Sequence, residues 1–127
     1  MNRLLVWFGM MLLFGVLASL WQEPAYAHAR LVKSVPAQRA VLKTLPKEIK
    51  LWFSEKLEPA YSSIVVIDQQ GKPVSTPPAA VAPADPKLMV LPLESLAPGV
   101  YQIQYRVLSV DGHVVEAGFS FTFQPAP

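Results

Sequence analysis

The sequence predicts an all-β domain, an antiparallel sandwich or a small barrel, that follows an export segment. Three observations predict this fold class. No segment after residue 27 sustains a helical period, strand patterns recur about six or seven times, and turn signals separate these patterns. The sequence has no internal repeat, and residues 28–127 suffice for one small hydrophobic core. We therefore expect a single domain over residues 28–127.

Residues 1–27 are predicted to be a secretory signal peptide. Arg3 supplies a positive start, residues 4–20 form an apolar run, and Ala25-Tyr26-Ala27 has the small-x-small pattern that signal peptidases cut after. The alternative is an uncleaved anchor, because the run approaches the roughly 20 residues that span a bilayer. We favour cleavage, since Glu23-Pro24 and the triplet stand where a cleavage region belongs. A simple signal of this kind indicates export to a bacterial periplasm.

The first half of the domain shows three strand patterns, at residues 29–34, 48–54 and 62–68. The second pattern alternates, so that Ile49, Leu51 and Phe53 share one face of the strand. The third is rich in β-branched residues on both faces. A turn is predicted at residues 70–73, where Gly71 and Pro73 interrupt the pattern.

The second half begins with a Pro- and Ala-rich stretch at residues 74–86, predicted to be a loop or a sheet edge. Strands follow at residues 88–93 and 100–108, separated by a turn at 97–99. Residues 109–113 form a tight connection to a last strand. Alternation in the last two strands points these side chains into the core: Tyr101, Ile103, Tyr105, Val107, Phe119, Phe121 and Phe123.

Charge and composition exclude several classes of function. The net charge is +2 and the basic residues are scattered, without a basic-aromatic pattern, so nucleic acid is not an expected partner. The sequence contains no cysteine. Thiolate zinc sites, iron–sulfur clusters and blue-copper centres with a Cys ligand are therefore excluded.

The two histidines of the chain stand in positions that suggest a metal site. Cleavage after Ala27 would make His28 the first residue, which offers its α-amine and its ring Nδ1 to a metal. In an extended segment Asp111 and His113 point to the same side, separated by Gly112. Nitrogen and oxygen donors of this kind suit Cu(II). The alternative is that Asp-Gly is an ordinary turn dipeptide and that the histidine beside it is solvent-exposed and binds no metal.

Seven segments carry a resemblance to a known family. They are His28-Ala-Arg-Leu, Ser34-Val-Pro36-Ala, Leu51-Trp-Phe53-Ser-Glu55, Asp85-Pro-Lys-Leu-Met89-Val, Pro98-Gly-Val-Tyr101, Tyr105-Arg-Val-Leu-Ser109-Val-Asp-Gly-His113 and Phe119-Ser-Phe-Thr-Phe123. Their order and spacing over residues 28–123 resemble the CopC family of periplasmic copper-resistance proteins. The resemblance implies a seven-stranded Greek-key β-sandwich, immunoglobulin-like or cupredoxin-like.

The resemblance also implies a Cu(II) site formed by His28, Asp111, His113 and, as in some family members, Glu55. We leave open whether Glu55 is a direct ligand or a residue that supports the ligands. Some family members bind Cu(I) through a Met-rich loop. The matching residues 69–86 contain no methionine, and Met89 is predicted to lie in the core. A Cu(I) site of that kind is therefore not expected.

The predicted function is a non-catalytic Cu(II) carrier for copper homeostasis or resistance. The resemblance implies a CopD-like inner-membrane copper transporter as its partner. One alternative is a copper-dependent oxidative enzyme, because a terminal histidine and a second histidine also form the centre of polysaccharide monooxygenases. The other alternative is a metal-free sandwich that acts as an adaptor.

Overall fold

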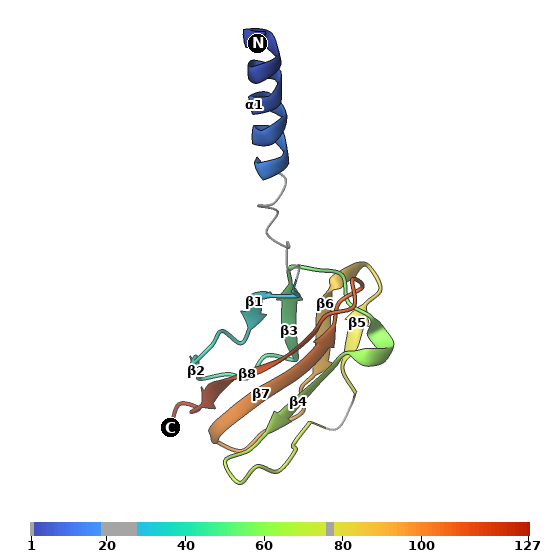
Figure 1. The fold of residues 1–127 in the computed structure, drawn as a ribbon. Helices are drawn as coiled ribbons and strands as arrows, with labels where there is room; N and C mark the ends of the chain where they lie inside the picture. The colour runs from blue at the N-terminus through green and yellow to red at the C-terminus, as the bar shows by residue number, and fades with distance from the viewer. Residues whose placement is uncertain (1, 19–27, 76–77) are drawn as a thin grey trace.

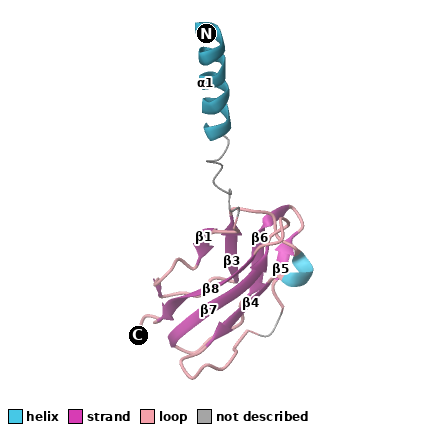
Figure 2. Cartoon of the chain, in the orientation of Figure 1, coloured by secondary structure: helices cyan, strands magenta, loops and turns pink. Residues whose placement is uncertain are grey.

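The computed structural model describes residues 2–18, 28–75 and 78–127. Helix α1 (Arg3–Ala18) precedes a domain of strands and loops (Figure 1, Figure 2). Within the described ranges, no helix combines the length and the apolar character needed to cross a membrane. The predicted cleavage triplet, Ala25–Ala27, lies outside the described residues.

The domain is a sandwich of two four-stranded sheets, with strand orders β1-β3-β6-β5 and β2-β8-β7-β4 (Figure 1). The chain repeatedly crosses from one sheet to the other, as between β3 and β4 and between β6 and β7, which is typical of Greek-key sandwiches. The strands are β1 (Leu31–Val35), β2 (Val41–Leu42), β3 (Glu48–Phe53), β4 (Ser63–Ile67), β5 (Ala80–Ala82), β6 (Asp85–Pro92), β7 (Gly99–Leu108) and β8 (Val114–Phe123), with a short 3₁₀ helix, η2 (Pro59–Tyr61). The predicted β-sandwich is confirmed.

The described residues contain eight strands, against the six or seven that the sequence predicted and the seven that the resemblance implied. The additional strand is β2, which has two residues and pairs in parallel with the end of β8. The Pro- and Ala-rich stretch contains the edge strand β5, in agreement with the prediction of a loop or an edge. Strand β6 begins at Asp85, three residues before the predicted start, and includes Pro86. Pro86 is tolerated because the pairing with β3 reaches only as far as Leu88.

The core lies between the two sheets, where the predicted inward faces meet. Ile49, Leu51 and Phe53 of β3 are buried, as predicted. Tyr105 is half-buried rather than buried, and its ring packs edge-to-face on Phe53 with centroids 5.3 Å apart. The buried apolar residues are Ala29, Ile49, Leu51, Phe53, Leu57, Ile64, Val66, Met89, Leu91, Tyr101, Ile103, Val107, Phe119 and Phe121.

Three segments meet at one end of the sandwich: residues 28–30, the bend at 54–57 after β3, and the β7–β8 connection at 109–113. The backbone N–H of Ser54 donates to the carbonyl of Arg30 at 2.8 Å. The backbone N–H of Val110 donates to the carbonyl of Lys56 at 2.9 Å, and Leu57 and Ser109 form an isolated bridge. The bend after β3 thus links the start of the domain to the β7–β8 connection.

Candidate metal site

The structure brings His28 and His113 together. Their ring centroids lie 4.8 Å apart, and the rings are nearly perpendicular at 78°. Ala29, which follows His28, has an exposed fraction of 0 % and fixes this segment on the core. Residues 85 positions apart in the chain therefore meet because the segment before β1 and the β7–β8 connection share one end of the sandwich.

Asp111 and His113 also lie close together, in a tight turn. Asp111 Oδ1 is 3.3 Å from His113 Nδ1. The backbone N–H of Gly112 donates to the carbonyl of Ser109 at 2.9 Å, and Gly112 has φ 93°, which glycine adopts without strain. The predicted tight connection at residues 109–113 is confirmed. The extended geometry assumed for Asp111 and His113 is not found, but the two side chains still lie close together.

Ser109 organises this turn from inside the domain. Its side chain is buried, with an exposed fraction of 1 %, and its Oγ donates to Asp111 Oδ1. The same hydroxyl contacts the backbone of His113, 3.2 Å from the carbonyl and 3.3 Å from the nitrogen. The hydrogen bond from Ser109 lowers the pKa of the Asp111 carboxyl, and His113 lowers this pKa further. These two effects outweigh desolvation, which raises the pKa. Asp111 is therefore held in its ionised, ligand-competent form.

His113 presents a buried nitrogen that lies 3.3 Å from the Asp111 carboxylate. Its Nδ1 atom is buried, and no group in the described part of the chain makes a hydrogen bond with it. A buried polar atom in this condition requires an explanation. An imidazole nitrogen beside a carboxylate and a second imidazole fits a metal ligand.

Glu55 forms no hydrogen bond or ion pair with His28, Asp111 or His113 in the described part of the chain. It lies half-buried in the bend after β3, and its side chain makes no ion pair or hydrogen bond with any described residue. Among the residues that the structure describes, no three His, Asp or Glu side chains lie close enough together to hold a metal ion. The structure shows two close pairs that share His113, and the four-residue ligand set stays a prediction.

Two serines near the site were not singled out from the sequence. Ser109 holds Asp111, and Ser54 hydrogen-bonds to residues 28–30. Both stand within the segments that carry the resemblance, next to the expected ligands Glu55 and Asp111. Their positions in those segments could have drawn attention to them, but a serine in a sequence does not show which group it will hydrogen-bond.

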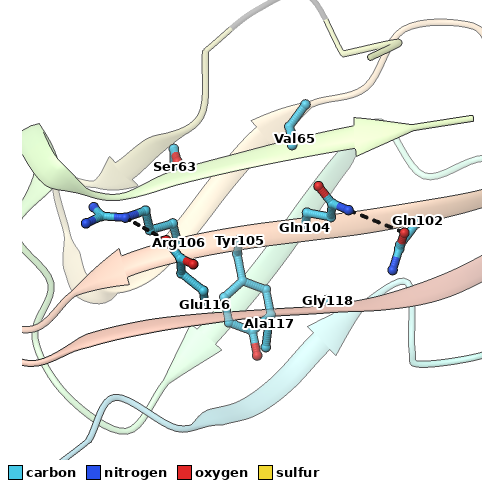
Figure 3. Close-up of a pocket in the computed structure, with 9 residues that line it drawn as sticks. All are labelled: Ser63, Val65, Gln102, Gln104, Tyr105, Arg106, Glu116, Ala117 and Gly118. Atoms are coloured by element: carbon cyan, nitrogen blue, oxygen red, sulfur yellow. Dashed lines mark hydrogen bonds and ion pairs between the residues drawn. The ribbon is translucent and has the colours of Figure 1, made fainter. Parts of the chain in front are cut away.

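A separate hollow on the outer face of β4, β7 and β8 has a different character (Figure 3). Arg106 Nε pairs with Glu116 Oε1 at 2.9 Å, and Gln104 Nε2 donates to Gln102 Oε1 at 3.4 Å. Gly118 also lines the hollow, and a Cβ at this position would lie 2.7 Å from the carbonyl oxygen of Ile103, so a side chain does not fit there. The lining of this hollow combines these polar side chains with Val65, Tyr105 and Ala117, and it includes neither His28 nor His113.

Comparison with known proteins identifies the family. The CopC domain pattern matches residues 31–124. Protein YobA from Escherichia coli (strain K12) is 34% identical over 105 residues, which cover 82% of this chain and 85% of that protein. Copper resistance protein C from Xanthomonas campestris pv. juglandis is 37% identical over 113 residues, which cover 84% of this chain and 88% of that protein.

A solved structure supports the same assignment. The crystal structure of CopC from Methylosinus trichosporium OB3b matches with a TM-score of 0.74 at 38% identity, over 79% of this chain and 97% of that one. The range that matches the CopC domain, residues 31–124, contains Asp111 and His113 and begins after His28. On this evidence of sequence and fold, the chain belongs to the CopC domain family.

Proposed function

We propose that the mature protein begins at His28 and binds one Cu(II) through His28, Asp111 and His113, for copper homeostasis or resistance in the periplasm. The observation that carries this proposal is the packing of His28 against His113, 4.8 Å between ring centroids. The names of the relatives support copper as the metal, since two of them carry copper resistance or CopC in their names.

The available donors favour Cu(II) over Cu(I). The α-amine of a terminal His28, two imidazoles and the Asp111 carboxylate are nitrogen and oxygen ligands, which suit Cu(II). Cu(I) prefers thiolates and thioethers. The sequence has no cysteine, and Met89 is fully buried in the core, away from any ion at the surface.

Removal of residues 1–27 as a signal peptide is part of the proposal. Helix α1 is apolar, and the side chains of Leu4, Leu5, Trp7 and Phe8 are exposed rather than packed on the domain. An apolar helix whose described side chains, at residues 3–10, are exposed is better explained as an export signal than as a part of the fold. Cleavage would also create the amine that the proposed site needs.

The proposed role is to buffer copper or to deliver it to a membrane transporter of the CopD kind. Asp111 is exposed, and the neighbouring Val110 is exposed as well, so the proposed site lies at the surface. An ion held there by surface groups is accessible to a docking partner. A carboxylate ligand also fills a position that an oxidative copper enzyme would need for oxygen, which favours a carrier.

The mature domain is expected to bind one Cu(II), to bind Zn(II) much more weakly, and to bind Cu(I) weakly. The reason is the nitrogen and oxygen donor set together with the Irving–Williams order. Competition with chelators selective for each ion measures the three affinities. Tighter binding of Cu(I) than of Cu(II) would contradict the proposed donor set.

Copper affinity is expected to fall as the pH falls from about 8 to about 5, because protons compete with the metal for imidazole and amine nitrogens. The Asp111 carboxylate does not contribute to this loss, since the hydrogen bond from Ser109 lowers its pKa and keeps it ionised in this range. Affinity measured with one competitor across the range provides the test. An affinity that does not change with pH would argue against nitrogen ligands.

A further inference from the structure

We infer that Ser54 is a positioning residue that fixes His28 beside His113. The consequence for copper binding rests on the proposed function, but the positioning itself does not. The sequence drew attention to Phe53-Ser54-Glu55 because of Glu55. In the structure Ser54 is the member of this segment that contacts the start of the domain.

Ser54 makes three hydrogen bonds to residues 28–30. Its Oγ accepts from the backbone N–H of Arg30 at 2.9 Å and donates to the carbonyl of His28 at 3.2 Å. Its backbone N–H donates to the carbonyl of Arg30 at 2.8 Å. One hydroxyl thus satisfies a donor and an acceptor on either side of Ala29.

This contact matters because regular strand pairing begins only at Leu31, so it does not include residues 28–30. Strand β1 begins at Leu31, which pairs with Phe53, and the register shifts between Leu31 and Lys33. The hydrogen bonds of Ser54 therefore hold residues 28–30 where the strand pairing of β1 does not reach. Ala29 is buried and holds the segment close, while the Ser54 hydroxyl sets where His28 points.

The chemistry of the hydroxyl explains the choice of residue. A hydroxyl can accept one hydrogen bond while it donates another, and Ser and Thr share this capacity. Ala and Val cannot make either bond, so they would leave the N–H of Arg30 and the carbonyl of His28 without this partner. Thr and Val have nearly the same shape, and they therefore separate the hydroxyl from packing.

The experiment uses the mature domain with its authentic His28 terminus, in the wild type and in Ser54→Thr, Ser54→Val and Ser54→Ala. Ser120→Ala is the matched control, because its hydroxyl makes no hydrogen bond among the described residues and it lies far along β8 from His113. Without metal, amide hydrogen exchange of Arg30 is measured by NMR. With metal, Cu(II) affinity is measured by competition and the ligand set by electron paramagnetic resonance.

We expect faster exchange of the Arg30 amide in Ser54→Val and Ser54→Ala, with wild-type protection in Ser54→Thr and Ser120→Ala. Cu(II) affinity should fall about tenfold or more in the Val and Ala variants, since a tenfold change equals about 1.4 kcal/mol and ordering the backbone of one residue costs a comparable free energy. Their copper spectra should change as well, which a purely structural role would not produce once thermal melts show folded protein.

Unchanged exchange of the Arg30 amide in Ser54→Val would overturn the positioning role, regardless of the Cu(II) affinity of that variant. The role would also be overturned if Ser54→Val lost protection and yet kept the affinity and the spectrum of the wild type. If the wild type itself failed to bind Cu(II), the proposed function would fail, while the exchange data would still decide whether Ser54 fixes residues 28–30. If Ser54→Ala failed to fold, the comparison of Ser54→Thr with Ser54→Val would decide the question.

Discussion

Phe121→Asp is expected to unfold the domain. Phe121 has an exposed fraction of 1 % and its ring stacks on Tyr101, with centroids 5.6 Å apart and an angle of 22°. A carboxylate at this position would be buried without a partner, which costs several kcal/mol or more. Because a domain is stable by only roughly 5–15 kcal/mol, most of the folded population should be lost. Thermal and urea melts followed by circular dichroism measure the effect.

The control for Phe121→Asp is Thr122→Asp, at the next position of β8, where the side chain points to the other face and is half-buried. It should melt close to the wild type. Tyr105→Asp should destabilise the domain by less than Phe121→Asp, because Tyr105 is already partly exposed. A native-like melt of Phe121→Asp would mean that the faces of β8 are assigned wrongly.

The sandwich could be predicted because its longer strands alternate strongly. In β3 every second side chain is buried, as the sequence shows directly in Ile49, Leu51 and Phe53, and β7 follows the same alternation except at the half-buried Tyr105. The period of two fixes which face is buried, independently of the partner strand. The core was therefore mostly predictable, including the place of Met89.

Other features of the fold depend on contacts that the local sequence does not show. Strand β2 has only two residues, so it cannot display an alternating pattern, and it exists because it pairs with the end of β8. The start of β6 at Asp85 depends on pairing with β5, whose Ala82 opposes Asp85. Tyr105 alternates correctly but is half-buried, because burial depends on the position of a residue within the sheet as well as on its face.

The candidate site was predictable only in part, because some of its residues act through contacts that the local sequence does not show. The chemistry of His28, Asp111 and His113 can be identified in the sequence, and the structure brings His28 to His113 and Asp111 to His113. The supporting roles of Ser54 and Ser109 could not be identified, because each acts through hydrogen bonds that exist only after folding. Whether Glu55 is a ligand stays a prediction, since its side chain makes no hydrogen bond or ion pair with a described residue.

A domain that begins at His28 is expected to bind Cu(II) much more tightly than the same domain with Met placed before His28. The amine and the ring Nδ1 of a terminal histidine close one chelate ring on the metal, whereas a peptide nitrogen at the same place is an amide and a poor ligand. Linking two donors in one residue raises binding by about a hundredfold or more over separate donors. We therefore expect a loss of roughly that size on extension or on acetylation of His28.

The comparison requires that the two forms fold equally. Residue 28 is exposed and precedes β1, so an added methionine should not change the thermal melt in the absence of metal. The affinities are measured in the same buffer with the same competitor. His113→Ala, in the authentic form, should cost a comparable factor. Glu55→Ala should cost less, because the Glu55 side chain makes no hydrogen bond or ion pair with a described residue.

This result would also determine when the site becomes active. If the amine is a ligand, the precursor cannot form the complete site, because the nitrogen of His28 is then part of the peptide bond to Ala27. Export and cleavage would create the copper site, and the uncleaved chain would keep only the imidazoles and the carboxylate. Equal affinities of the authentic and the extended forms would instead show that the terminus is not a ligand. The packing of His28 on His113 would then be a contact between side chains without a role for the amine.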